Sequence, residues 1–215
     1  MQYGERFSHI WIIEVSDLIM KKYQNLEVKK LATVAILTAL TIVLSLIKIP
    51  IIGASVTLVL PVVVIGAALY GPIVGAWLTV IPNLLAFSEA GIFMTYSPAG
   101  CVATLLLKGI LAGIAAGFVY KLLSGKRPLV AVTCAAVVAP VINSGIFALG
   151  CYLFIWDELV NLAGENGIGI GMLVFGLVGL NFIIELIFNV VLCPTILRII
   201  QIAPKFAAKK NADQK

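Results

Sequence analysis

The stretch LATVAILTALTIVLSLI, residues 31–47, decides the fold because it is seventeen residues long and carries no charge. At roughly 1.5 Å per residue, a helix of this length is about long enough to cross a bilayer. The basic pair Lys29-Lys30 precedes it, and the positive-inside rule places such residues in the cytoplasm. We therefore predict a transmembrane helix that begins on the cytoplasmic side.

Small residues recur along one face of this stretch. Ala32, Ala35 and Ala39 are separated by three and four residues, which places them on the same side of a helix. Small side chains at this spacing let a second helix approach closely, and such packing is a main source of helix association in lipid. The pattern predicts close contact between this face and another helix.

The composition of the whole chain agrees with a membrane protein. Of its 215 residues, 61% are hydrophobic and only 12% are charged, whereas a soluble domain is about one quarter charged. The net charge of +5 lies in short flanks beside apolar runs. Such flanks favour contact with anionic lipid and a fixed topology rather than binding to nucleic acid.

We predict an all-α membrane protein with six transmembrane helices. The predicted spans are residues 31–47, 56–70, 73–87, 101–123, 129–155 and 172–200. Pro61 and Pro140 predict irregularity in the second and fifth spans, because proline removes a helical hydrogen bond. Gly109, Gly113 and Gly117 recur every four residues in the fourth span and predict a second close helix contact.

The chain divides into three predicted segments. Residues 1–28 are a cytoplasmic or interfacial segment, residues 29–200 are a membrane domain of six helices, and residues 201–215 are a basic cytoplasmic tail. Apolar residues around Trp11 suggest a short helix at the membrane surface. Alternatively, residues 1–19 are an extension upstream of a start at Met20, and the sequence leaves both interpretations open.

Basic residues gather on one side of the predicted spans. Five precede the first span, three lie near the end of the fourth, and five follow from Arg198 onward, which makes thirteen of fifteen. The positive-inside rule makes that side cytoplasmic, and six spans bring both termini to it. The predicted loops Ser88–Gly100 and Trp156–Gly171 then face outside.

Few polar groups lie within the spans, and each is costly in lipid unless it has a role. One interpretation is an outward-facing pocket for a small polar ligand, in which Lys108 meets a carboxylate. The other is an internal network, in which Lys108 pairs with Glu185 or a loop carboxylate and the asparagines bond neighbouring helices. The candidate binding residues are Asn83, Tyr96, Lys108, Asn143 and Asn181.

Catalytic motifs are missing from the sequence. The single histidine, His9, lies outside the spans, and neither HExxH nor GxxxxGK[ST] occurs. The four cysteines show no CxxC or Cys/His spacing of the kind that binds metal. We expect no enzymatic activity, no metal site, no cofactor and no nucleotide hydrolysis by this chain.

The order of these features resembles a known family. The passages KKLATVAILTALTIVLSLI (residues 29–47) and VTLVLPVVVIGAALYGPIVGAWLTVIPNLL (residues 56–85) are similar to the substrate-binding S component of energy-coupling factor (ECF) vitamin transporters. The resemblance covers about residues 28–200. Its most specific parts are the alanine face of the first span and the passage through Tyr70-Gly71-Pro72.

The resemblance implies a function in a bacterial plasma membrane. An S component binds a vitamin outside, topples in the bilayer and releases the vitamin inside. Two ATPase subunits drive this through a coupling transmembrane subunit, on which the alanine face docks. The amide-rich candidate site with one lysine favours pantothenate, and riboflavin or folate is the alternative ligand. A structural or regulatory membrane subunit and a stand-alone carrier are the alternative functions.

Overall fold

A computed structural model describes residues 27–47, 49–51, 54–56, 58–89, 91–125 and 127–212. The predicted surface helix around Trp11 therefore lies outside the described residues. The chain forms two compact units, Met1–Ile36 and Leu37–Lys215.

The described elements are mostly helices. In chain order they are a helix Glu27–Leu46, β1 (Ile49–Ile51), β2 (Ala54–Val56), α2 (Val59–Tyr70), α3 (Pro72–Leu85), a 3₁₀ helix η1 (Ala86–Glu89), α4 (Gly91–Tyr96), α5 (Pro98–Leu123), α6 (Pro128–Phe154), α7 (Trp156–Glu165), α8 (Ile170–Val174), a π-helical segment η2 (Phe175–Gly179) and α9 (Leu180–Ala212). The predicted helical class is confirmed. The loop predicted after the first span instead holds an antiparallel hairpin, in which Ile49 pairs with Val56 and Ile51 with Ala54.

Four helices in the described part are long and apolar enough to cross a membrane. They are Glu27–Leu46, Pro98–Leu123, Pro128–Phe154 and Ile170–Ile202, which correspond to the first, fourth, fifth and sixth predicted spans. Helices α2 and α3 have 12 and 14 residues, or roughly 18 and 21 Å. Because neither reaches the thickness of a hydrocarbon core alone, the six-span topology stays a prediction.

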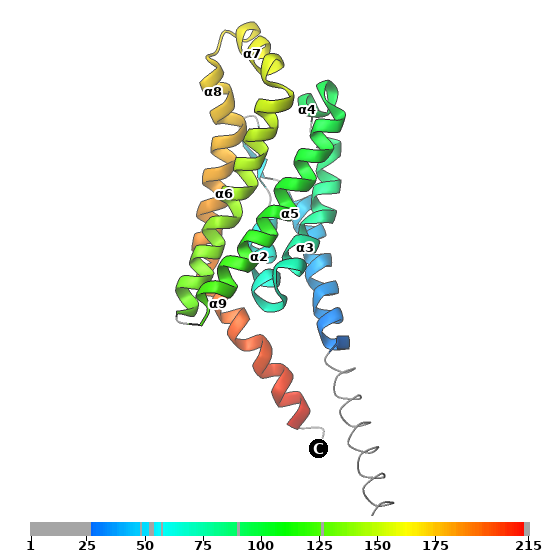
Figure 1. The fold of residues 1–215 in the computed structure, drawn as a ribbon, viewed down its shortest axis with the longest axis vertical. Coiled ribbons are helices and arrows are strands. Elements are labelled where there is room, and N and C mark those ends of the chain that lie inside the picture. The colour runs from blue at the N-terminus through cyan, green and yellow to red at the C-terminus, as the bar shows by residue number, and fades with distance from the viewer. Residues whose placement is uncertain are drawn as a thin grey trace, which may run out of the picture. The chain divides into compact units, whose positions relative to one another are not determined.

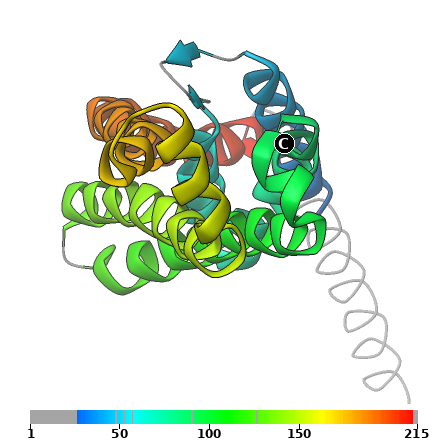
Figure 2. The ribbon, with the colours of Figure 1, turned by 90° about the horizontal axis from the view of Figure 1, so that it is seen from above.

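Helix α2 is apolar on all sides, and it is packed among other helices. Its residues from Val59 to Ala67 are all buried, and it contacts α3, α5, α6 and α9 (Figure 2). A helix that is hydrophobic all round fits such an interior position. Gly71 follows at φ = +97°, where glycine is favoured, and turns the chain into α3.

The predicted glycine face of α5 is confirmed as a close contact with α3. A Cβ atom built on Gly113 would overlap the backbone of Gly75, and one on Gly117 would lie 2.6 Å from Cα of Pro72. The backbones of α3 and α5 therefore approach more closely than any larger residue would allow. Figure 1 shows the two helices side by side.

Two sequence-based expectations about where helices are continuous are wrong. Helix α6 runs unbroken through Pro140, since neighbouring groups can satisfy a carbonyl freed by proline inside a membrane bundle. The two predicted outer loops contain α4 and α7. Helix α7 forms because Leu159 and Ala163, one turn apart, are buried. Helix α9 continues to Ala212, whereas the candidate membrane span ends at Ile202, close to the predicted end of the sixth span.

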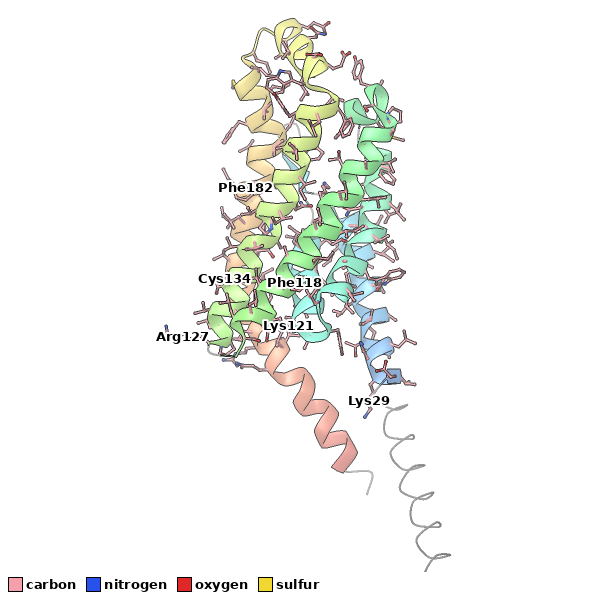
Figure 3. All side chains as sticks on the ribbon, viewed as in Figure 1. Lys29, Phe118, Lys121, Arg127, Cys134 and Phe182 are labelled. Carbon is pink, nitrogen blue, oxygen red and sulfur yellow. The ribbon has the colours of Figure 1, made fainter. Side chains whose placement is uncertain are left out.

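The two ends of the Leu37–Lys215 unit differ in charge. Lys121 and Arg127 flank the connection between α5 and α6, at the end opposite α7 (Figure 3). Helix α7 carries Asp157 and Glu158 in its first turn and ends at Glu165. The α7 end is therefore acidic, and the end formed by the α5–α6 connection is basic.

Candidate functional site

A buried carboxylate lies at the centre of the polar groups within the long helices. Glu185 of α9 is only 7% exposed. Asn143 of α6 donates from Nδ2 to Oε2 of Glu185 at 3.2 Å. One turn along α9, Asn189 donates from Nδ2 to the backbone carbonyl of Glu185 at 2.9 Å. Asn181 lies one turn in the other direction along α9. The bond from Asn143 joins α6 to α9.

Among the described residues, Lys108 of α5 is the one cation that acts electrostatically on this carboxylate. Its ammonium nitrogen lies 4.8 Å from the ring centroid of Phe147, a cation–π contact. Lys108 interacts electrostatically with Glu185. Among the described residues, however, it forms no direct ion pair. Among the described residues, the ammonium group therefore has an aromatic neighbour but no carboxylate in contact.

Aromatic rings continue from Lys108 toward α4 and α7. Phe147 lies 6.1 Å from Phe93 of α4, centroid to centroid, and Phe93 lies 6.5 Å from Phe154. Phe93 is 3% exposed and belongs to an apolar cluster with Ile155 and Leu159. The cluster members Leu105 of α5 and Cys151 of α6 lie nearer the α7 end of their helices than Lys108 and Asn143 do.

Several buried polar atoms lack a partner in the described part of the chain. They are Nδ2 of Asn83, Oγ of Ser144, and Oδ1 of Asn181 and of Asn189. Buried polar groups are almost always hydrogen-bonded, so each of these atoms still has the capacity to form a hydrogen bond with a ligand or with water. The Asn83 nitrogen is a donor, and the Asn181 and Asn189 oxygens are acceptors.

Helical rise places three of the predicted site residues at a similar depth. Counted from the α7 end of their helices, Lys108, Asn143 and Asn181 lie roughly 15–17 Å inward. Asn83 of α3 lies near the level of Lys108, because its amide packs against Gly109, the residue after Lys108. The structure thus groups four of the five candidates around the α5–α6–α9 region.

The fifth candidate, Tyr96, lies apart from this group. It ends α4, is 56% exposed, and lines a cavity of about 410 Å³ together with residues of α7. Two carboxylates, Glu158 and Glu165, and the amide of Asn161 are also in its wall. None of the other four candidates lines this cavity, so the structure does not join Tyr96 to the polar cluster.

Comparison with known proteins identifies the family. A family model for the substrate-specific component of ECF transporters matches residues 29–197. The chain belongs to this family. It is thus the substrate-binding subunit of a multi-pass membrane transporter and not an enzyme, as the resemblance in the sequence implied. No curated protein and no solved structure gives a significant match.

The alanine face of this ECF substrate-specific component is exposed. Within the Leu37–Lys215 unit, Leu37, Thr41 and Ser45 turn one side of the first long helix into the interior, while Ala39 on the other side is exposed. Ala32 and Ala35, in the preceding unit, are exposed as well. All three alanines of the predicted docking face are therefore exposed among the described residues.

The internal network that the sequence allows for the polar residues is formed only in part in this substrate-specific component. The hydrogen bond from Asn143 to Glu185 is a contact of the internal network. The direct ion pair between Lys108 and Glu185, which the same interpretation predicts, is not formed among the described residues.

The residue patterns in the sequence did not single out Phe147 as the neighbour of Lys108. Its position four residues after Asn143, on the same face of α6, was the signal.

Proposed function

We propose that this ECF substrate-specific component captures pantothenate outside the cell and delivers it inward. The observation that carries the proposal is Lys108, an ammonium group within a membrane span and without a carboxylate in contact among the described residues. A charge in such a place requires a counter-charge to be stable. The carboxylate of an acidic substrate supplies it.

The other groups of the candidate site suit the rest of the molecule. Pantothenate carries one carboxylate, one amide and two hydroxyl groups, so it needs both donors and acceptors. Asn83 offers an unpaired Nδ2 donor, and Asn181 offers an unpaired Oδ1 acceptor. Asn143 adds a further amide at the same depth, and Tyr96 is proposed to meet the substrate at the entrance. We regard Asn83, Tyr96, Lys108, Asn143 and Asn181 as the substrate-binding residues.

The proposed orientation has both termini in the cytoplasm of a bacterial cell. The basic end with Lys121 and Arg127 then faces inward, in accordance with the positive-inside rule. The acidic α7 end and the cavity beside Tyr96 face outward. In this orientation the polar cluster is reached from outside, past the aromatic rings.

Transport requires partners that this chain does not contain. We propose that two ATPase subunits and a coupling transmembrane subunit drive the toppling of the substrate-specific component. The exposed alanine face is the proposed docking surface for the coupling subunit, because small side chains permit close helix contact. The chain itself contributes the substrate site.

Titration calorimetry of the purified chain in lipid nanodiscs tests the proposed substrate. Pantothenate is expected to bind saturably at one site, and native mass spectrometry of protein from cells grown in rich medium is expected to show the corresponding adduct. Saturable binding of riboflavin or folate in place of pantothenate would reassign the substrate. Failure of the whole vitamin panel, with no adduct, would favour a structural subunit instead.

Replacing Ala39 by tryptophan is expected to abolish vitamin uptake and leave substrate binding unchanged. The large indole holds the partner helix away from the docking face, whereas the substrate residues lie on other helices. Uptake is measured in cells that co-express the ATPase and coupling subunits, and affinity is measured on the purified chain.

The matched control is Ala103→Trp, which changes another exposed alanine, on α5. This control is expected to retain uptake, because Ala103 lies outside the proposed docking face. Normal uptake by Ala39→Trp would contradict the docking face. Uptake that persists without any ATPase subunit would indicate a stand-alone carrier.

A further inference from the structure

We infer that the π-helical segment η2 (Phe175–Gly179) is the positioning element of the substrate site. The one residue that it adds to a helical turn brings Asn181 and Glu185 onto the inward side of the last membrane span. The inference rests on the proposed function, since it concerns how Asn181 comes to face the substrate. It gives a role to η2, to which the candidate site assigns none.

The first step is the local geometry of the backbone. Helix α8, η2 and α9 form one continuous apolar span, Ile170–Ile202. Before η2 the chain is α-helical, since N–H of Phe175 donates to the carbonyl of Gly171, four residues earlier. At the end of η2, N–H of Leu180 donates to the carbonyl of Phe175, five residues earlier. A turn closed in this way holds one residue more than an α-helical turn, which makes η2 a single π-bulge.

The second step concerns the inward side of the span before and after this bulge. Toward the α7 end, the residues packed against the apolar cluster around Phe93 are Ile170, Leu173 and Leu177. Beyond η2, up to residue 202, the buried residues are Glu185, Asn189, Cys193 and Ile196. In an uninterrupted α-helix, which turns about 100° per residue, the mean directions of these two sets would lie roughly 120° apart. The extra residue turns the later set back by about 100°, so that both sets share one side of the span.

The exposed side of the span gives the same result. Its large exposed apolar residues are Met172 and Phe175 before the bulge closes, and Ile183, Ile187, Val190, Val191, Ile199 and Ile202 after it. In an uninterrupted α-helix the mean directions of these two sets would lie roughly 105° apart, whereas one extra residue brings them within roughly 10°. Both sides of the span therefore require the residue that η2 adds.

The third step connects this rotation to the polar groups. Glu185 accepts a hydrogen bond from Asn143 of α6, which requires the Glu185 side chain to be turned inward. Asn181, one turn earlier on the same side, has a buried Oδ1 without a partner in the described part of the chain. Without the extra residue, Leu180 would take the direction that Asn181 now has, and a leucine side chain forms no hydrogen bond. The bulge thus decides whether an amide or an apolar side chain meets the substrate.

The test is a pair of single-residue deletions in the complete chain in nanodiscs, with titration calorimetry of pantothenate. Deletion of Val178 removes the extra residue within η2, so a straight α-helix keeps Asn181 and Glu185 in their present directions. This variant is expected to bind pantothenate within about threefold of the unaltered affinity.

The matched variant is deletion of Ile183, an exposed residue between Asn181 and Glu185. It also permits a straight α-helix in which Glu185 keeps its direction, but Asn181 then turns away by about 100°. Its affinity for pantothenate is expected to fall about tenfold, as is that of Asn181→Leu in the full-length chain, because each loses the amide at this point.

Melting temperatures separate positioning from stability. Both deletions leave the buried residues of α9 directed at α2 and α6, so both chains are expected to fold. If the chain without Ile183 does not fold, Asn181→Leu in the chain without Val178 takes its place. This substitution is expected to cost about tenfold in affinity there too, since Asn181 still faces the substrate.

The outcomes distinguish this inference from the proposed function. The inference is wrong, and the proposed substrate stands, if the unaltered chain binds pantothenate but deletion of Val178 abolishes folding or binding. The same holds if the two deletions bind pantothenate equally well, or if Asn181→Leu has no effect in the chain without Val178. If the unaltered chain binds another vitamin instead, the proposed substrate fails, and the same variants test the inference with that vitamin. If no vitamin binds, both fail.

Discussion

Replacing Lys108 by alanine is expected to weaken pantothenate binding by about 30- to 4,000-fold. Truncation of one partner in a buried pair of charges costs about 2–5 kcal/mol, and each 1.4 kcal/mol is a factor of ten. The effect is large because, among the described residues, Lys108 is the only cation that acts electrostatically on Glu185, and no second ammonium replaces it. Affinity is measured by titration calorimetry on the purified chain.

Lys121→Ala is the control for this substitution. Lys121 is an exposed lysine on the same helix, but it lies at the end remote from α7. Its loss is expected to leave the affinity unchanged. A Lys108→Ala variant that binds with unaltered affinity but melts at a lower temperature would support the internal network instead. Panthenol, the uncharged alcohol analogue of pantothenate, provides a further check. Because it has no carboxylate, its affinity is expected to depend little on Lys108.

Replacing Gly113 by alanine is expected to destabilise the protein by about 1–3 kcal/mol. The added methyl group overlaps the backbone of Gly75, so α3 and α5 must separate. Because α3 also carries Asn83, binding of the substrate is expected to weaken together with the fold. The measurement is the melting temperature in detergent micelles, followed by titration with pantothenate.

Gly145→Ala is a matched control, because Gly145 is also inside a long helix and nothing lies within 4 Å of the added Cβ atom. Alanine is the better helix former by roughly 0.5–1 kcal/mol, and this gain applies equally at both positions. The difference between the two variants therefore measures the helix contact alone. Equal melting temperatures would show that α3 and α5 do not depend on close approach.

The sequence by itself determined the long helices and the family. An uncharged apolar run of sufficient length crosses lipid wherever it occurs, so the first, fourth, fifth and sixth spans follow from local composition. Regular spacing of small residues is equally local, and the contact of Gly113 with Gly75 was therefore predictable as a close helix contact. The resemblance to ECF substrate-specific components rested on the same stretches.

Only the tertiary structure decided which groups meet. The sequence left open whether Lys108 pairs with Glu185, and in the structure Asn143 takes the carboxylate while Phe147 lies beside the ammonium. The continuity of α6 through Pro140 likewise became known only from the folded chain. The physical reason is common to these cases: polar partners and helix breaks inside a bundle depend on neighbours distant in sequence, whereas hydrophobic length depends on consecutive residues.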